Sequence, residues 1–210
     1  LTDGGRAALA ELCRDLGPAW TAAHGREHLV SQALRALHLY QRDQQYLVDA
    51  DGRRTVHHIH DEKTEALAEL IDSMGREPLL VCYQFDQDLE NIRKIFKNVP
   101  YIGQGVAASV ATDHIDRWNK RELPVLALHP NSASHGLNLQ YGGHHLAFLA
   151  LPWGLDGYKQ TVERIDRRGQ TQPVYSHHIL ARDTIDQKVS AALVEKDDAQ
   201  NRLIAAIRRI

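Results

Sequence analysis

The chain has 210 residues, of which 43% are apolar, so it can bury one sizeable core with a small appendage beside it. Its formal net charge of -2 at pH 7 excludes a global basic field, and nucleic-acid binding would have to use a local patch. No run approaches the roughly 18 consecutive apolar residues of a membrane span, and no basic-then-apolar signal pattern opens the chain. We therefore expect a soluble protein.

The cysteines and the first residue bear on the setting of the chain. Of the two cysteines, Cys82 lies in an apolar run, where a buried free thiol is the usual outcome. We therefore expect a reducing, cytoplasmic setting. The chain begins at Leu1 and its single methionine is Met74, which indicates a piece of a longer polypeptide.

The first part of the chain differs in pattern from the rest. Residues 5–47 carry apolar side chains at helical spacing. Two short strands around a glycine turn are predicted at residues 46–48 and 55–57. The sequence thus predicts a helical and hairpin appendage over residues 1–55 and a main domain over residues 56–210.

From residue 61 onward, helices and strands alternate. The apolar runs lack polar alternation, which indicates strands covered on both faces, as in a parallel sheet. The predicted elements are strands at 79–83, 101–102, 124–129, 145–150 and 174–180, and helices through 67–71 and at 86–97, 107–119, 157–168 and 184 to the end. This order predicts an α/β fold in which helices flank a parallel sheet in three layers.

Ligands of an open parallel sheet bind outside the carboxyl ends of its strands. The predicted strand 124–129 is followed by residues 130–140, in which small residues are mixed with hydroxyl and amide side chains. Such a loop can approach phosphate or ribose oxygens closely. An ordinary polar loop with a helix cap explains the segment equally well on its own.

Two other strand ends deliver aromatic residues to the same edge. Tyr83, Gln84 and Phe85 follow one predicted strand, and Trp153 follows another. Packing in the core is the commoner role of such aromatics. Gln84 is the better functional candidate of the first group.

Histidines are frequent, but their spacing does not indicate a metal site. In a strand, His57 would oppose His58 and His60, and no distant ligand is signalled. We therefore predict no metal site. Two pairs at predicted strand starts are expected to be exposed or capping residues: His144, His145, His177 and His178.

The segment 160–170 places Arg164 and Arg167 three residues apart on one face of a predicted helix. Two planar, permanently charged guanidinium groups aimed at one point suit the oxygens of a phosphoryl group in transfer. Salt bridges to Glu163 or Asp166 on a solvated face are the competing interpretation, and for the pair by itself the safer one.

A glycine pattern at Gly103, Gly105 and Ala108 matches the form G-x-G-x-x-A of a dinucleotide-binding fingerprint. The strand before it is short, and the next strand ends without the acid expected for a ribose, so the signal is weak. No G-x-x-x-x-G-K-[ST] motif and no paired acid for magnesium occur. An ATP site on this chain would therefore be half a site.

Taken together, these segments resemble the second, carboxy-terminal RecA-like lobe of superfamily-two helicases, most closely the Swi/Snf-type DNA-dependent ATPases. Residues 134–140 resemble motif V of that family, and Trp153 takes the place of the tryptophan usual between motifs V and VI. Motif VI, of the form Q-x-x-x-R-x-x-R-x-G-Q, coincides with Gln160, Arg164, Arg167, Gly169 and Gln170.

The resemblance extends over about residues 60–195. Residues 115–119 resemble the family's R-x-x-x-I-x-x-F-N helix, without its arginine and with Trp118 in place of phenylalanine. The lysine-led start at residues 60–63 and the segment 184–186 are more similar to phage or prophage members than to eukaryotic remodellers.

The resemblance implies an enzyme that uses ATP and Mg²⁺ in a full-length parent. A missing amino-terminal lobe would supply the phosphate loop and the Mg²⁺ ligands, and the isolated chain would be inactive. Arg164 and Arg167 would be catalytic, and the nucleotide would be bound by Gln160, Gly136 and Asn138. The DNA backbone, without sequence readout, would be contacted by Gln84, Ser132, Ser134, His135 and Trp153.

Two alternatives of other classes stay open. The first is an enzyme domain that binds a dinucleotide or S-adenosylmethionine through residues 103–108. The second is a non-catalytic interaction scaffold whose arginines only form salt bridges.

Overall fold

The computed structural model describes most of the chain after residue 43. The described residues are 44–48, 54–58, 61–75, 77–134, 136–152, 154–182 and 184–207. The helices predicted before residue 44 lie outside the described residues.

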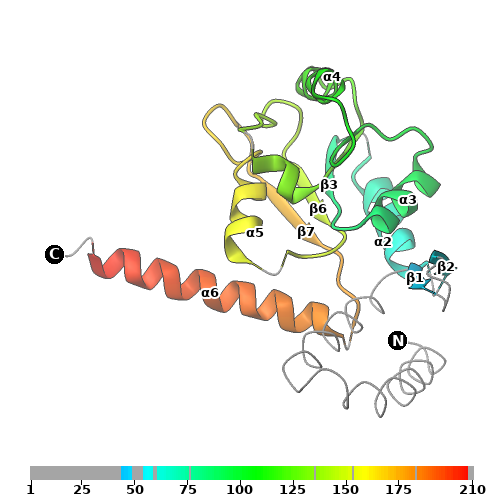
Figure 1. The fold of residues 1–210 in the computed structure, drawn as a ribbon. Helices are drawn as coiled ribbons and strands as arrows, with labels where there is room; N and C mark the ends of the chain where they lie inside the picture. The colour runs from blue at the N-terminus through cyan, green and yellow to red at the C-terminus, as the bar shows by residue number, and fades with distance from the viewer. Residues whose placement is uncertain are drawn as a thin grey trace, which may run out of the picture.

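The centre of the structure is a five-stranded sheet in which all neighbouring strands are parallel (Figure 1). The strand order is β4-β5-β3-β6-β7. The strands are β3 (Leu79–Cys82), β4 (Tyr101–Ile102), β5 (Val125–Leu128), β6 (His145–Phe148) and β7 (Tyr175–His178). Each lies within or coincides with a predicted strand, and the α/β prediction is confirmed.

The central strand explains why the apolar runs lack polar alternation. Leu79 of β3 pairs with Val125 of β5 on one side and with His145 of β6 on the other. All four residues of β3 are buried, because helices cover both faces of the sheet. Cys82 is a buried free cysteine, as predicted, and burial raises the pKa of its thiol.

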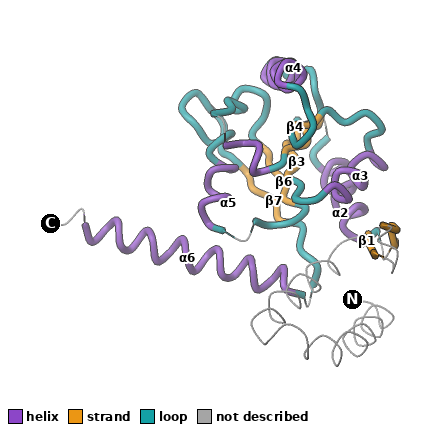
Figure 2. Tube along the Cα trace, in the orientation of Figure 1, coloured by secondary structure: helices purple, strands orange, loops and turns teal. Residues whose placement is uncertain are grey.

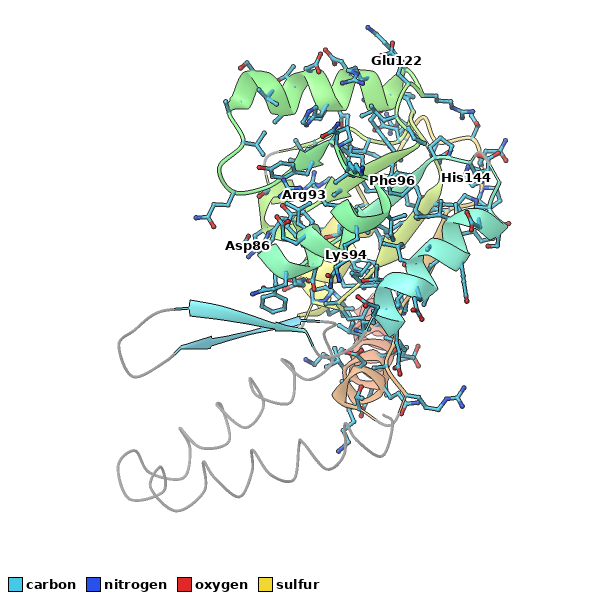
Figure 3. The ribbon with its side chains drawn as sticks, turned by 90° about the vertical axis from the view of Figure 1, so that its right-hand side faces the viewer. Asp86, Arg93, Lys94, Phe96, Glu122 and His144 are labelled. Carbon is cyan, nitrogen blue, oxygen red and sulfur yellow. The ribbon has the colours of Figure 1, made fainter. Side chains whose placement is uncertain are left out.

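Helices form the outer two layers, and Figure 3 looks onto one of these layers, with the sheet behind it. On one face lie α2 (Glu62–Ser73) and α3 (Asp86–Ile95), whose apolar residues pack on Leu79 and Val81. The other face packs through Leu80 and Cys82. It is covered by α4 (Ala108–Asn119), α5 (Leu155–Val162) and α6 (Ile185–Ile207). The three-layer, RecA-like arrangement is therefore confirmed.

The hairpin of the predicted appendage is present. β1 (Gln44–Val48) and β2 (Arg54–His58) pair antiparallel, with Tyr46 opposite Val56. The helix predicted up to residue 47 is wrong at its end, because residues 44–47 pair as a strand.

The largest difference from the predicted elements concerns the arginine pair. α5 ends at Val162, so Arg164 and Arg167 lie in the turns that follow and not on a helix. The carbonyl of Arg164 accepts a hydrogen bond from the N–H of Leu139 at 3.0 Å. A continuing helix would need that carbonyl for its own backbone, and the contact with Leu139 replaces it.

A buried ion pair joins α2 to the start of α6. Lys63 Nζ lies 2.6 Å from Asp186 Oδ2 and donates to the carbonyl of Leu149 at 2.9 Å. Asp186 Oδ2 also accepts the N–H of Ala181 at 3.0 Å. Lys63 is 6% exposed and Asp186 is 2% exposed, so water does not screen the pair. We call this pair, with Leu149, the lysine clasp.

The histidine pairs are less exposed than predicted. His145 and His177 are half-buried, their rings stack at 15°, and His145 Nδ1 lies 3.0 Å from His177 Nε2. Burial lowers the pKa of both imidazoles, and neighbouring histidines lower that of His145 further. The neighbouring strands β6 and β7 bring the two rings together.

Within the described residues, none of the helices combines the length and apolar content needed to cross a membrane.

Removing one partner of the lysine clasp should strongly destabilise the fold. We expect Lys63→Ala to lower the free energy of unfolding by about 3–5 kcal/mol, because it leaves the Asp186 carboxylate buried without its cation. The double variant Lys63→Met with Asp186→Asn should lose much less, since no buried charge remains. Urea unfolding monitored by circular dichroism measures both, and equal losses would contradict the electrostatic explanation.

The histidine pair should make stability depend on pH. The folded-state pKa values of His145 and His177 lie below the ordinary value of about 6.5, so the unfolded chain takes up protons first as the pH falls. The free energy of unfolding should therefore decrease as the pH is lowered below about 6.5. We expect His177→Gln to flatten this slope in unfolding curves recorded between pH 5 and 8, and an unchanged slope would refute the assignment.

Candidate functional site

Two loops meet at the amino edge of the sheet, the edge at which its strands begin (Figure 2). The first is the β5–β6 loop, residues 129–144, which contains the 3-10 turn η1 (Pro130–Ser134). The second is the arginine turn, residues 163–170, between α5 and β7. Gln170 Nε2 donates to the carbonyls of Gln140 at 3.0 Å and Gly143 at 2.9 Å. Gly143 lies just before β6, which places the contact at this edge.

Arg167 lies beside a predicted nucleotide-binding residue. It is exposed in the arginine turn, and its Nη1 donates to Asn138 Oδ1 at 2.7 Å. Asn138 is itself exposed in the β5–β6 loop. The predicted catalytic residue and the predicted nucleotide ligand are therefore brought together.

Arg164 is half-buried, and its Nε is buried without a hydrogen-bond partner among the described residues. A buried N–H donor without an acceptor is unfavourable, and an anion beside the guanidinium would remove that penalty. Among those residues, neither Arg164 nor Arg167 forms an ion pair with Glu163 or Asp166. The salt bridges of the competing interpretation are therefore not formed with these two carboxylates in the described part of the chain.

Two glycines with positive φ shape the backbone of these loops. Gly136 has φ +67° and Gly169 has φ +102°, a backbone conformation that residues other than glycine rarely adopt. A Cβ on Gly169 would also lie 3.1 Å from the ring of Tyr141. Gly136 is exposed, with nothing within 4 Å of a Cβ position, so its glycine serves the turn alone.

The other predicted site residues are not gathered here. Gln160 is exposed on α5, Ser132 is half-buried in η1, and Gln84 is half-buried just after β3. The side chain of Ser134, and the whole of His135 and Trp153, lie outside the described residues.

The arginine turn does not lie at the carboxyl edge of the sheet, where the candidates that follow strands are expected. Gln84 does lie at that edge, and its carbonyl contacts His129 Nε2 at 3.2 Å. α5, however, carries the chain from the end of β6 back to the start of β7, as parallel strands require. Arg164 and Arg167 follow α5 and therefore lie toward the amino edge.

Two residues at the end of α4 support the site, and neither was predicted to belong to it. The indole Nε1 of Trp118 donates to the carbonyl of Leu139 at 2.9 Å, and Asn119 Nδ2 donates to the carbonyl of Asn138 at 2.8 Å. The indole packs against Gly142 and Gly143. Two adjacent glycines before a predicted strand were the available signal, because they allow close approach of a large side chain.

The fingerprint-like segment has a packing explanation. It follows β4, a two-residue strand at the edge of the sheet. A Cβ on Gly103 would collide with the hydroxyl of Tyr83, and Gly105 has φ +81°. Burial raises the pKa of Tyr83 to about 12, so this hydroxyl stays protonated. The glycines are accounted for without a bound dinucleotide.

In the part of the chain that the structure describes, no cluster of three or more histidine, cysteine or acidic side chains could hold a metal ion. His60, one of the three histidines considered from the sequence, lies outside that part.

Known proteins resemble this chain in sequence and in structure. No protein-family model matches the chain. Protein p41 of Acyrthosiphon pisum secondary endosymbiont phage 1 is 37% identical over 165 residues, which are 76% of this chain and 35% of p41. The Bacillus subtilis protein YwqA, whose name describes an ATP-dependent helicase/translocase, is 22% identical over 149 residues, 68% of this chain and 16% of YwqA.

A solved structure supports the same fold. The carboxy-terminal part of the Fun30 ATPase domain superimposes with a TM-score of 0.57 and 16% identity, covering 88% of this chain and 64% of that one. The predicted RecA-like fold is thus supported by a solved ATPase domain, and weak similarity in sequence extends to a protein described as a helicase/translocase. The chain spans about a third of the length of p41.

Gln170 should be essential for the junction of the two loops. Besides its two donated bonds, its Oε1 accepts the N–H groups of Thr171 and Gln172, each at 3.0 Å. We expect Gln170→Ala to reduce the free energy of unfolding by roughly 1–3 kcal/mol, because buried partners lose their bonds. Gln170→Glu should cost more, since a carboxylate oxygen would face two carbonyl oxygens.

Gln172→Ala, at an exposed position in the same segment, is the matched control and should leave stability unchanged in the same denaturant titration. A Gln170→Glu variant as stable as the unmodified chain would contradict the role of this junction.

Proposed function

We propose that this chain is the carboxy-terminal motor lobe of a DNA-dependent ATPase, a helicase or translocase, and that Arg164 and Arg167 are its arginine fingers. The observation that carries the proposal is the arginine turn. The exposed guanidinium of Arg167 donates to Asn138, and Arg164, three residues earlier, has a buried Nε without an acceptor among the described residues. Both features suit an anionic ligand approaching this edge of the sheet.

The chemistry follows from charge. In phosphoryl transfer the negative charge on the transferred group spreads over its oxygens, and planar guanidinium forks can stabilise it by paired hydrogen bonds. Arginine fingers contribute about three to five orders of magnitude in turnover in related enzymes. Asn138 holds Arg167 in the β5–β6 loop. Of the other residues assigned to the nucleotide, Gly136 shapes the turn of that loop, and Gln160 lies on α5, outside the junction of the two loops.

The other half of the site would come from a second lobe of the same polypeptide. The described residues contain no metal-ligand cluster, so acidic ligands for Mg²⁺ would belong to that lobe, where the ion would neutralise phosphate charge. The isolated chain is therefore expected to bind one face of a nucleotide without hydrolysing it.

DNA would be contacted through its phosphates. Gln84 and Ser132 lie at or near the carboxyl edge of the sheet, and the proposed contacts continue through Ser134, His135 and Trp153. Backbone contacts carry no sequence information, so binding should be non-specific and should weaken with rising salt.

The proposal is tested in the two-lobe parent. Arg167→Ala should lower the DNA-stimulated rate of ATP hydrolysis by about 10³–10⁵-fold, because the guanidinium group that stabilises the negative charge on the transferred phosphoryl group is removed. Arg167→Lys should also be strongly impaired, since an ammonium keeps the charge but not the paired geometry.

Arg168→Ala is the matched control, because Arg168 is exposed in the same turn and its hydrogen bond with Gln140 uses its backbone carbonyl, which the substitution keeps. It should hydrolyse ATP normally. An active Arg167→Ala parent, or rapid ATP turnover by residues 1–210 alone, would refute the proposal.

A further inference from the structure

We infer that Trp118 is a positioning residue for the arginine fingers, acting through the Leu139 peptide of the β5–β6 loop. This inference rests on the function proposed above. It assigns a role to the position at which a tryptophan replaces the phenylalanine of the related helicase pattern.

The indole is fixed on all sides. Trp118 is fully buried at the end of α4, and its Nε1 donates to the carbonyl of Leu139 at 2.9 Å. A Cβ on Gly142 would overlap the indole, and one on Gly143 would lie 3.2 Å from its Cζ2. Close packing of the indole thus accounts for Gly142, whereas at Gly143 the carbonyl of Pro78, 2.9 Å from a Cβ position, also leaves no room for a side chain.

The same peptide holds the arginine turn. Leu139 is fully buried, and its N–H donates to the carbonyl of Arg164 at 3.0 Å. Its two backbone groups thus connect Trp118 on one side to Arg164 on the other. A phenylalanine at position 118 could fill most of the space of the indole but could not donate a hydrogen bond to Leu139.

The neighbouring residue makes a parallel connection to the second arginine. Asn119 Nδ2 donates to the carbonyl of Asn138 at 2.8 Å, and Asn138 Oδ1 accepts from Arg167 Nη1 at 2.7 Å. Consecutive residues of α4 therefore hold consecutive carbonyls of the loop, and each held residue contacts one of the two arginines.

The outer face of α4 offers no comparable route to the site. Its one arginine, Arg117, lies 3.8 Å from Asp113 and 3.7 Å from Glu122. These carboxylates oppose any contact of Arg117 with a phosphate. α4 thus acts on the arginine turn from its buried end.

The kinetic consequence differs from that of a general loss of stability. A displacement of about 1 Å at a catalytic group can cost around 100-fold in rate. An interaction made only in the transition state lowers kcat and leaves KM largely unchanged when it is weakened. Loosening the Leu139 peptide should therefore reduce kcat for ATP and not the apparent affinity.

The test uses Trp118→Phe in the two-lobe parent. We expect kcat for DNA-stimulated ATP hydrolysis to fall about 10- to 100-fold, with KM for ATP changed by less than about twofold. Combining Trp118→Phe with Arg164→Ala should reduce the rate no further than Arg164→Ala alone, because Leu139 connects Trp118 to Arg164, and a displaced finger and a deleted one are the same defect.

Two further variants separate positioning from folding. Ile92→Val is the control for stability, because it removes one methylene from the core on the opposite face of the sheet. It should lower the melting temperature slightly and leave kcat unchanged. Asn119→Asp keeps the size of the side chain and removes the donor to Asn138, and it should lower kcat as Trp118→Phe does. If Trp118→Phe does not fold, Asn119→Asp carries the test by itself.

Failures of the two proposals are distinguishable. Normal hydrolysis by Arg167→Ala would overturn the proposed function. An inactive Arg167→Ala parent together with normal kcat in Trp118→Phe or Asn119→Asp, or additive losses in the double variant, would overturn the positioning role alone.

Discussion

The peptide of Leu139 is the constraint on which the candidate site depends. The residue is fully buried outside any helix or strand, so its N–H and C=O need partners within the protein. It finds them in Arg164 and in the indole of Trp118. These two hydrogen bonds connect α4, the β5–β6 loop and the arginine turn. Gln170 adds a second connection between the loop and the turn, because it donates to the loop carbonyls of Gln140 and Gly143.

The sheet could be predicted from the sequence, whereas the junction could not. A run such as Leu79–Cys82 is buried on both faces and carries a local signal that any parallel sheet would produce. The end of α5 carries no such signal, because it depends on a hydrogen bond between the carbonyl of Arg164 and the N–H of Leu139, 25 positions earlier in the chain. The spacing of Arg164 and Arg167 could be seen in the sequence, but their secondary structure and the edge of the sheet on which they lie depend on tertiary hydrogen bonds. Trp118 was visible only as a departure from a pattern.

The candidates fall on two opposite edges of the sheet, and one loop connects them. The β5–β6 loop starts at His129, beside Gln84 at the carboxyl edge, and reaches Gly143 beside Gln170 at the amino edge. In the proposed motor, residues assigned to DNA and residues assigned to nucleotide would thus belong to one continuous segment. A shift of that segment along the sheet would alter both contacts at once, which is the coupling that a translocase requires.

The lysine clasp has a mechanical consequence for the domain. Lys63 is the second residue of α2 and Asp186 the second residue of α6, so the pair ties the two helices at their roots. α6 packs on the body through Val189 and Leu193, and Asp197 pairs with Lys159 of α5, before its last turns run outward (Figure 1). Tension applied along that helix would be shared by the desolvated ion pair, the buried side chains of Val189 and Leu193, and the pair of Lys159 with Asp197. Part of it would pass through the carbonyl of Leu149 into the neighbouring strand β6, so a force on α6 would reach the sheet by more than one path.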